Sequence, residues 1–186
     1  MTKIQIIVGT TRPNRVSTQV AEWALEQAKK RSDAEFEIVD IVDFDLPLYN
    51  EPLPPKMGQY KFDYTKKWAE KIAEADGYIF VTAEYNHSIP PSLTNAISYV
   101  YAEWNNKSAG IISYGAAGGV RAAEHLRQIA AELQLADVSN HTHINMNTDF
   151  ENWSTFKPSE ALDASVSSLY DQTVAWANAL APLRQK

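Results

Sequence analysis

The chain has 186 residues, no cysteine and a formal net charge of −6, with 45% hydrophobic and 22% charged residues. The lack of cysteine excludes disulfide frameworks, thiolate zinc sites and cysteine nucleophiles, and the acidic balance argues against nucleic acid as a partner. No stretch approaches the roughly 20 apolar residues that a membrane span needs, and no cleavable leader is visible. We therefore expect one domain, residues 1–186, in the cytoplasm and not in a membrane.

Short apolar stretches alternate with longer amphipathic ones along the chain. The apolar stretches predict five strands, at Ile4–Val8, Phe36–Ile41, Gly77–Thr82, Ser108–Tyr114 and Val138–Ile144. The amphipathic stretches predict five helices, at Ser17–Lys30, Tyr64–Ala75, Ser92–Glu103, Val120–Leu135 and Ser159–Leu180. Residues Val42–Gly58 contain four prolines and predict a long packed loop.

Strictly alternating strands and helices predict an α/β fold, a parallel sheet wound with helices on both faces. In such sheets ligands bind beyond the carboxyl ends of the strands, where the strand order reverses. The loops that follow the first, third and fourth strands are therefore the candidate site.

The first of these loops is rich in hydroxyl groups and arginine and runs directly into a helix. Thr10, Arg12, Arg15 and Ser17 are its main polar side chains, and a helix N-terminus with hydroxyls and a guanidinium suits a phosphate. The G-x-G-x-x-G and G-K-[ST] patterns are absent, which favours a single phosphate monoester over a dinucleotide or a triphosphate. The alternative is an ordinary strand-to-helix turn with capping hydroxyls and solvated arginines.

The other two loops suit a planar ring. The stretch Glu84–Ser88 is polar and aromatic and is stiffened by Pro90 and Pro91, whereas Gly115 and Gly118 would let backbone approach a ligand closely. Both features also occur in plain connections. Together with the first loop, however, they describe a site for flavin mononucleotide (FMN).

Three stretches also resemble a known family, the NADPH-dependent FMN reductases, which include quinone, azo-dye and chromate reductases. They read GTTRPNR, AEYNHSIPPSLTNAISY and SYGAAGG, and the resemblance extends to about Leu135. It implies a flavodoxin-like fold with a five-stranded parallel sheet, bound FMN, and NADPH or NADH as the donor. It further implies ping-pong hydride transfer to a small acceptor such as a quinone, flavin, azo dye or metal oxyanion, in a homodimer or dimer of dimers.

The resemblance assigns roles residue by residue and implies no catalytic side chain and no metal. Thr10, Arg12 and Ser17, with Arg15 and Val16 adjacent, occupy the positions that hold the FMN phosphate. Four residues fall where the family lines the flavin ring: Glu84, Tyr85, Asn86 and His87. Gly115 and Gly118 fall on the loop at the other edge of the ring.

Two other interpretations remain open. A flavodoxin-type electron carrier would share the fold and the FMN but would receive its electrons from a protein partner. A binding or scaffold domain on the same fold would hold no flavin at all.

A few residues outside the three loops also invite a functional reading. His141 and His143 share one strand face but lack a third metal ligand. Three aromatic residues on or after the third predicted helix are expected in the core or at an interface: Tyr99, Tyr101 and Trp104. The resemblance favours a dimer interface that also forms a wall of the active site. Trp153 and Phe156 suit either a pocket cap or an anchor for residues 145–158.

Overall fold

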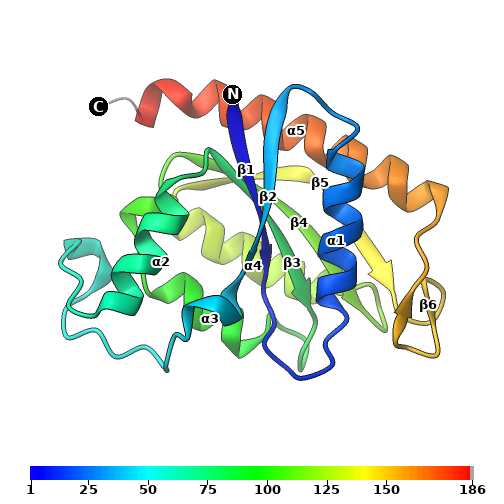
Figure 1. The fold of residues 1–186 in the computed structure, drawn as a ribbon, viewed down its shortest axis with the longest axis horizontal. Helices are drawn as coiled ribbons and strands as arrows, with labels where there is room; N and C mark the ends of the chain where they lie inside the picture. Colours follow the sequence, from blue (N-terminus) through cyan, green and yellow to red (C-terminus); the bar gives the residue numbers. More distant parts are fainter. Residues whose placement is uncertain (185–186) are drawn as a thin grey trace.

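The structure, a computed structural model, describes residues 1–184. Its main sheet has five parallel strands in the order β2-β1-β3-β4-β5 (Figure 1). The strands are β1 (Thr2–Val8), β2 (Ala34–Asp40), β3 (Gly77–Ala83), β4 (Lys107–Gly115) and β5 (Leu135–Asn145). The predicted α/β fold with a five-stranded parallel sheet is confirmed.

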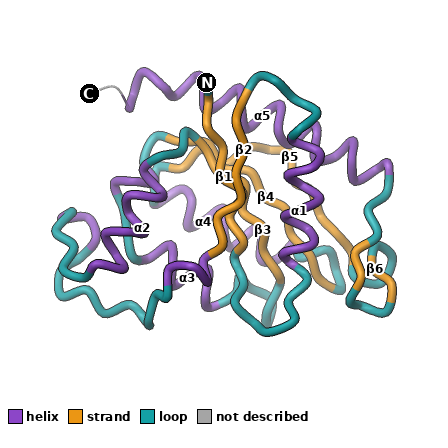
Figure 2. The backbone as a smooth tube through the Cα atoms, viewed as in Figure 1, coloured by secondary structure: helices purple, strands orange, loops and turns teal. Residues whose placement is uncertain are grey.

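Helices cover both faces of the sheet (Figures 1 and 2). They are α1 (Ser17–Ala28), α2 (Asp63–Ala73), α3 (Pro91–Ser98), α4 (Val120–Glu132) and α5 (Glu160–Arg184). Apolar side chains of α1 and α5 pack on one face, and those of α2, α3 and α4 pack on the other. Among residues 1–184, no helix has the combination of length and apolar character that crossing a membrane requires.

The strand order reverses between β1 and β3. β1 pairs with β2 on one side and with β3 on the other, so that Ile4 lies opposite both Phe36 and Gly77. The inner strands are buried on both faces, and every residue of β3 and β4 is buried, as their near-continuous apolar sequence predicts. The loops after β1 and β3 therefore leave the sheet side by side at the reversal.

The third helix is shorter than the sequence predicts, because α3 ends at Ser98 rather than Glu103. Beyond it the chain turns so that Trp104 inserts fully into the core, with its ring centroid 4.8 Å from that of Tyr78. The indole N–H of Trp104 donates to the Ile97 carbonyl at 3.3 Å, one of the acceptors freed where the helix stops. The interface interpretation of Trp104 is thus wrong, since its own chain buries it; Tyr99 is likewise fully buried.

A small hairpin, β6 (Phe150–Glu151) with β7 (Thr155–Phe156), follows β5 and has no counterpart in the predicted elements. Phe156 is buried, with its ring centroid 5.4 Å from that of Trp23 on α1, whereas Trp153 at the tip is 57% exposed. Of the two interpretations of this segment, the anchor applies to Phe156.

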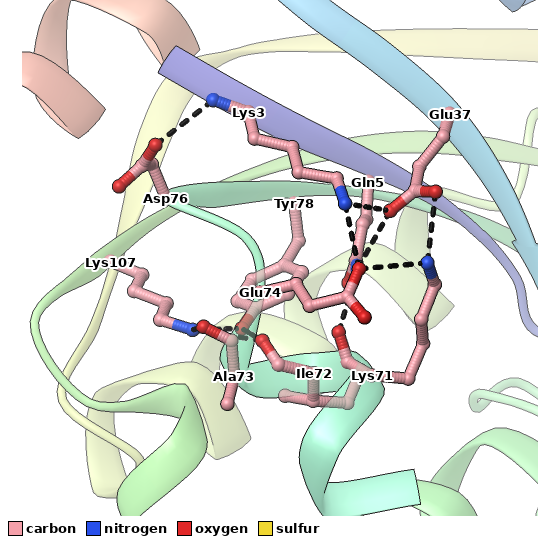
Figure 3. A network of polar contacts seen from close by, with 10 residues as sticks. All are labelled: Lys3, Gln5, Glu37, Lys71, Ile72, Ala73, Glu74, Asp76, Tyr78 and Lys107. Carbon is pink, nitrogen blue, oxygen red and sulfur yellow. Dashed lines mark hydrogen bonds and ion pairs between the residues drawn. The ribbon is translucent and has the colours of Figure 1, made fainter. Parts of the chain in front are cut away.

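A network of charged side chains lies at the N-terminal ends of the strands, at the end of the sheet away from the loops that follow β1 and β3 (Figure 3). Lys3 and Lys71 both pair with Glu37 and Glu74, with N–O distances of 2.7–3.0 Å. Beside them the buried Lys107 ammonium donates to the carbonyls of Ile72 and Ala73 and to the Tyr78 hydroxyl. These bonds satisfy carbonyls at the C-terminus of α2 and join that helix to β4.

Candidate functional site

Three loops meet at the carboxyl edge of the sheet, after β1, β3 and β4 (Figure 1). Backbone bonds fix their spacing: the Gly9 N–H donates to the Val81 carbonyl at 2.9 Å, and the Glu84 N–H donates to the Tyr114 carbonyl at 3.0 Å. The Ser92 hydroxyl, at the start of α3, donates to the Gly9 carbonyl at 3.0 Å. The loops singled out in the sequence are therefore neighbours in space.

Hydroxyl groups form the floor of the first loop. Thr10 and Ser17 are completely buried, and their hydroxyls are hydrogen-bonded to each other. The Tyr114 hydroxyl lies against both: burial raises the pKa of Tyr114, while hydrogen bonds to Ser17 and Thr10 and the nearby charge of Arg12 oppose that rise. Val16 stands at the N-cap of α1, so no side chain caps that helix within residues 1–184.

The two arginines of this loop differ in their partners. Arg15 is half-buried and donates to the Thr10 carbonyl at 2.8 Å and to the Asp40 carboxylate at the end of β2. Arg12 is exposed, and its guanidinium has no hydrogen bond or ion pair with the side chains or backbone of residues 1–184. Arg15 therefore braces the loop, and Arg12 is the guanidinium available to an anion.

The second loop contains a tight turn. Tyr85 and Ser88 exchange two backbone hydrogen bonds of 2.9 and 3.0 Å, and the two residues between them, Asn86 and His87, both have positive φ angles of 52° and 63°. This is the geometry of a two-residue hairpin turn, for which asparagine is a favoured residue. The turn exposes Asn86 and His87 at the edge of the site.

Glu84 connects the second loop to α4. Its carboxylate accepts the Arg121 backbone N–H at 3.1 Å and the Arg121 side-chain Nε–H at 2.7 Å. Burial raises the pKa of Glu84, but the bonds from Arg121 outweigh it, so the pKa lies below its ordinary value of 4.5. One turn further along α4, His125 Nδ1 lies 2.9 Å from the Ser88 hydroxyl. These two links hold the second loop against the start of α4.

The third loop turns at Gly115–Gly118, where the Gly118 N–H donates to the Gly115 carbonyl at 3.0 Å. A Cβ on Gly115 would lie 3.3 Å from the Glu84 Cβ, so glycine allows the second and third loops to approach each other. Gly118 has a φ angle of +73°, a conformation that other residues rarely adopt. Ala116 and Ala117 form the exposed tip.

All eleven residues singled out in the sequence lie on these three loops or at the element ends beside them, with Ser17 the first residue of α1 and Gly115 the last residue of β4. Their side chains do not all face one ligand, because Arg15 and Glu84 are engaged by other protein groups. Tyr114 and Ser113 beneath the loops were not predicted as site residues, and His141 was considered only as a metal ligand. Their position at the carboxyl halves of β4 and β5 was the one available signal.

A pocket of about 590 Å³ lies beside these loops rather than between them. The 41–48 segment after β2 and the first turns of α3 form its walls, and Thr11 is its only contribution from the first loop. None of the eleven residues lines it. His141 and His143 belong to no group of three or more potential metal ligands within residues 1–184.

The donor groups fit FMN. A phosphate needs anion-binding donors, which the uncapped N-terminus of α1 and the unpaired Arg12 provide beside the buried Thr10 and Ser17 hydroxyls. A planar ring needs close approach of backbone, which Gly115 and Gly118 permit. Fold and site thus define a class: open α/β proteins that bind a phosphate-bearing ligand where the strand order reverses.

Comparison with known proteins narrows that class. A family model described as NADPH-dependent FMN reductase matches residues 2–149. An NAD(P)H-dependent FMN reductase of Schizosaccharomyces pombe is 40% identical over 135 residues, which span 72% of this chain and 68% of the relative. A 2-hydroxy-1,4-benzoquinone reductase of a Burkholderia species is 34% identical over 143 residues, 72% of each chain. The chain belongs to the NADPH-dependent FMN reductase family.

Family membership confirms the resemblance noted in the sequence and, with it, the enzyme class and cofactors: an oxidoreductase that uses FMN and NAD(P)H. A solved structure agrees on the fold. FerB, described as a flavoenzyme NAD(P)H:(acceptor) oxidoreductase from Paracoccus denitrificans, superposes with a TM-score of 0.74 over 96% of this chain and 98% of its own, at 20% identity.

Proposed function

We propose that the protein transfers hydride from NADPH or NADH to bound FMN and then passes the electrons to a small acceptor, a quinone or a flavin in the first place. The observation that carries this proposal is the unpaired Arg12 above the buried hydroxyls of Thr10 and Ser17, at the uncapped N-terminus of α1. Relatives named as FMN and quinone reductases support the choice of acceptors. Azo dyes and metal oxyanions are further candidates that the same open site would admit.

FMN, when bound, supplies the redox chemistry, and the chain binds and orients it. Arg12, the hydroxyls of Thr10 and Ser17 and the free N–H groups at the start of α1 would hold the phosphate. The Tyr85–Ser88 turn and the Gly115–Gly118 turn would border the ring. No side chain has to act as a general acid or base in this scheme, which leaves the exposed His87 as a hydrogen-bonding group.

Initial-rate kinetics test this function. NADPH and 1,4-benzoquinone are varied against each other with the FMN-loaded protein. A ping-pong mechanism, in which donor and acceptor alternate at one face of the site, gives parallel double-reciprocal lines. Intersecting lines would contradict the shared face, and the absence of NADPH oxidation would contradict the reductase itself.

An electron carrier fed by a protein partner is the second candidate. It would share the fold and the FMN, and only a partner protein would reduce it. The phosphate-binding loop of this chain carries Arg12 and Arg15, which favours the reductase over a carrier whose loop relies on hydroxyl groups. Prompt reduction by NADPH with no other protein present separates the two candidates.

We further propose that the chain acts as a single FMN-binding domain that assembles as a homodimer or a dimer of dimers. The support is the proline-rich loop, residues 42–58, which is ordered by bonds to α3 and yet exposes apolar side chains. Asn95 binds the backbone of both Pro47 and Tyr49 at 2.6–2.8 Å, whereas Leu48 is 84% and Met57 53% exposed. The cytoplasmic location stays a prediction.

A further inference from the structure

Two side chains support the third loop from below. The Ser113 hydroxyl, on β4, donates to the Gly118 carbonyl at 2.6 Å and lies 2.7 Å from His141 Nε2 on β5. A serine hydroxyl has only one hydrogen, and Gly118 receives it. The Ser113 oxygen therefore accepts from His141, whose Nε2 must carry a hydrogen. The result is a directed relay from His141 through Ser113 to Gly118.

The relay fixes the Gly118 carbonyl, a part of the turn that other side chains do not hold. The Gly115 carbonyl accepts from the backbone N–H of Gly118 and of Met146, each at 3.0 Å, and the Ala116 carbonyl accepts from the Asn147 side chain at 3.1 Å. Ser113 supplies the matching bond for the Gly118 carbonyl. The N–H groups of Ala116 and Ala117 have no partner within residues 1–184.

The turn also sits directly on Ser113. Gly119 has a φ angle of +70°, and a Cβ there would lie 2.8 Å from the Ser113 Cβ and 2.8 Å from the Tyr114 nitrogen. Backbone and serine are thus in contact with no room for a side chain between them. A change at Ser113 or at His141 should therefore shift the turn, because no empty space lies between them to accommodate it.

We propose that His141 and Ser113 are positioning residues that hold the 115–119 turn in the conformation that binds the flavin ring. The inference rests on the proposed function, because it assigns a purpose to this turn in FMN binding. With the carbonyls of Gly115, Ala116 and Gly118 engaged by protein groups, the turn keeps the N–H groups of Ala116 and Ala117 for the acceptor atoms of the ring edge.

His141 is well suited to a fixed tautomer. It is half-buried, and its ring centroid lies 5.8 Å from that of His143. Burial, followed by the nearby His143 and Arg127, lowers the pKa of His141 to about 4. The ring is therefore neutral at physiological pH, with its hydrogen on the nitrogen that faces Ser113.

The test is FMN affinity, measured by quenching of flavin fluorescence on the apoprotein. Ser113→Ala removes both bonds of the relay and His141→Phe removes the one between His141 and Ser113, and each variant should raise the Kd for FMN about tenfold. His141→Gln keeps an amide N–H that reaches Ser113 and should stay within about twofold of wild type. Ser139→Ala, on the exposed side of β5, is the matched control and should change nothing.

A double variant and the flavin spectrum complete the test. Once Ser113→Ala has cut the relay, adding His141→Phe should weaken binding little further, and the visible circular dichroism of bound FMN should change in both single variants but not in His141→Gln. Thermal unfolding of each apoprotein separates positioning of the turn from general stability of the fold. If these residues only stabilise the fold, their loss lowers the unfolding midpoint and leaves the Kd for FMN unchanged.

Two outcomes would overturn the inference and leave the proposed function intact, provided that wild type binds FMN. One is an unchanged Kd in the small Ser113→Ala variant, and the other is His141→Gln binding FMN as weakly as His141→Phe. If wild type itself does not bind FMN, the proposed function and the inference fail together.

Discussion

At the scale of single residues, Arg12 and Arg15 are two identical side chains in one loop that have different roles. Arg15 is committed to the Thr10 carbonyl and to Asp40, so its loss would leave a half-buried carboxylate without its partner. Arg12 has no partner in residues 1–184. The sequence could not separate them, because Asp40 belongs to another strand and only folding brings it to Arg15.

Arg12→Ala should therefore raise the Kd for FMN by about ten- to a hundredfold, the effect of losing a charge-assisted bond. The free energy of unfolding of the apoprotein should stay within about 0.5 kcal/mol of wild type, since an exposed side chain is removed. Fluorescence titration and urea unfolding measure the two quantities. Lys29→Ala, which removes an exposed positive charge at the far end of α1, is the control. An unchanged affinity would remove the phosphate assignment of Arg12.

Lys107 gives a prediction at the opposite edge of the sheet. Burial, with Arg184 nearby, lowers its pKa from 10.5 to about 7. Between these values the unfolded chain binds a proton that the folded chain does not, so stability contributed by this residue rises with pH. The unfolding free energy of wild type relative to Lys107→Met should grow by about 2 kcal/mol from pH 7 to pH 9.

Urea unfolding at several pH values between 6 and 9 measures this difference. Lys30→Met, at an exposed lysine, serves as the control and should give a constant offset over the same range. A constant offset for Lys107→Met as well would show that the buried ammonium keeps its proton throughout.

At the scale of elements, the sequence predicted the five strands and the meeting of the three loops because both follow from local patterns. Buried parallel strands appear as apolar runs, and their loops must meet at one edge. What the sequence could not predict depends on contacts across the fold. Trp104 ends α3 early because the core accepts its ring, and the β6–β7 hairpin is held by Phe156 against Trp23.

The hydrogen bonds from Arg121 to the Glu84 carboxylate join the second loop to α4, and their contribution to stability can be tested. Because the folded-state pKa of Glu84 lies below 4.5, its contribution to stability is present above that pH and is lost as pH falls through the folded-state value. Glu84→Gln should therefore be less stable than wild type at pH 7, and the difference should shrink as the pH falls below 4.5.

Urea unfolding of the apoprotein at pH 7 and at pH 4 measures this change. Glu124→Gln, an exposed position on the same helix, is the control and should give small effects at both pH values. A difference between Glu84→Gln and wild type that persists undiminished at pH 4 would contradict the role of the charge.

At the scale of the whole molecule, exposed apolar residues on the ordered 42–58 loop predict an interface between copies of the chain. Leu48→Asp combined with Met57→Lys should convert the assembly into monomers, because both side chains would lose apolar contact area and bring charge into the interface. Size-exclusion chromatography with light scattering measures the mass. Val120→Lys, at an exposed apolar side chain on α4, is the control. A monomeric wild type would contradict this prediction.

The central claim is that the three loops hold FMN and present it to NADPH. Its most direct test is the anaerobic visible spectrum of the protein after incubation with FMN and desalting, recorded before and after NADPH is added. We expect a flavin band that survives desalting and bleaches promptly with NADPH. A protein with no band would contradict FMN binding by the three loops, and a band that persists after NADPH would contradict the reductase in favour of a carrier.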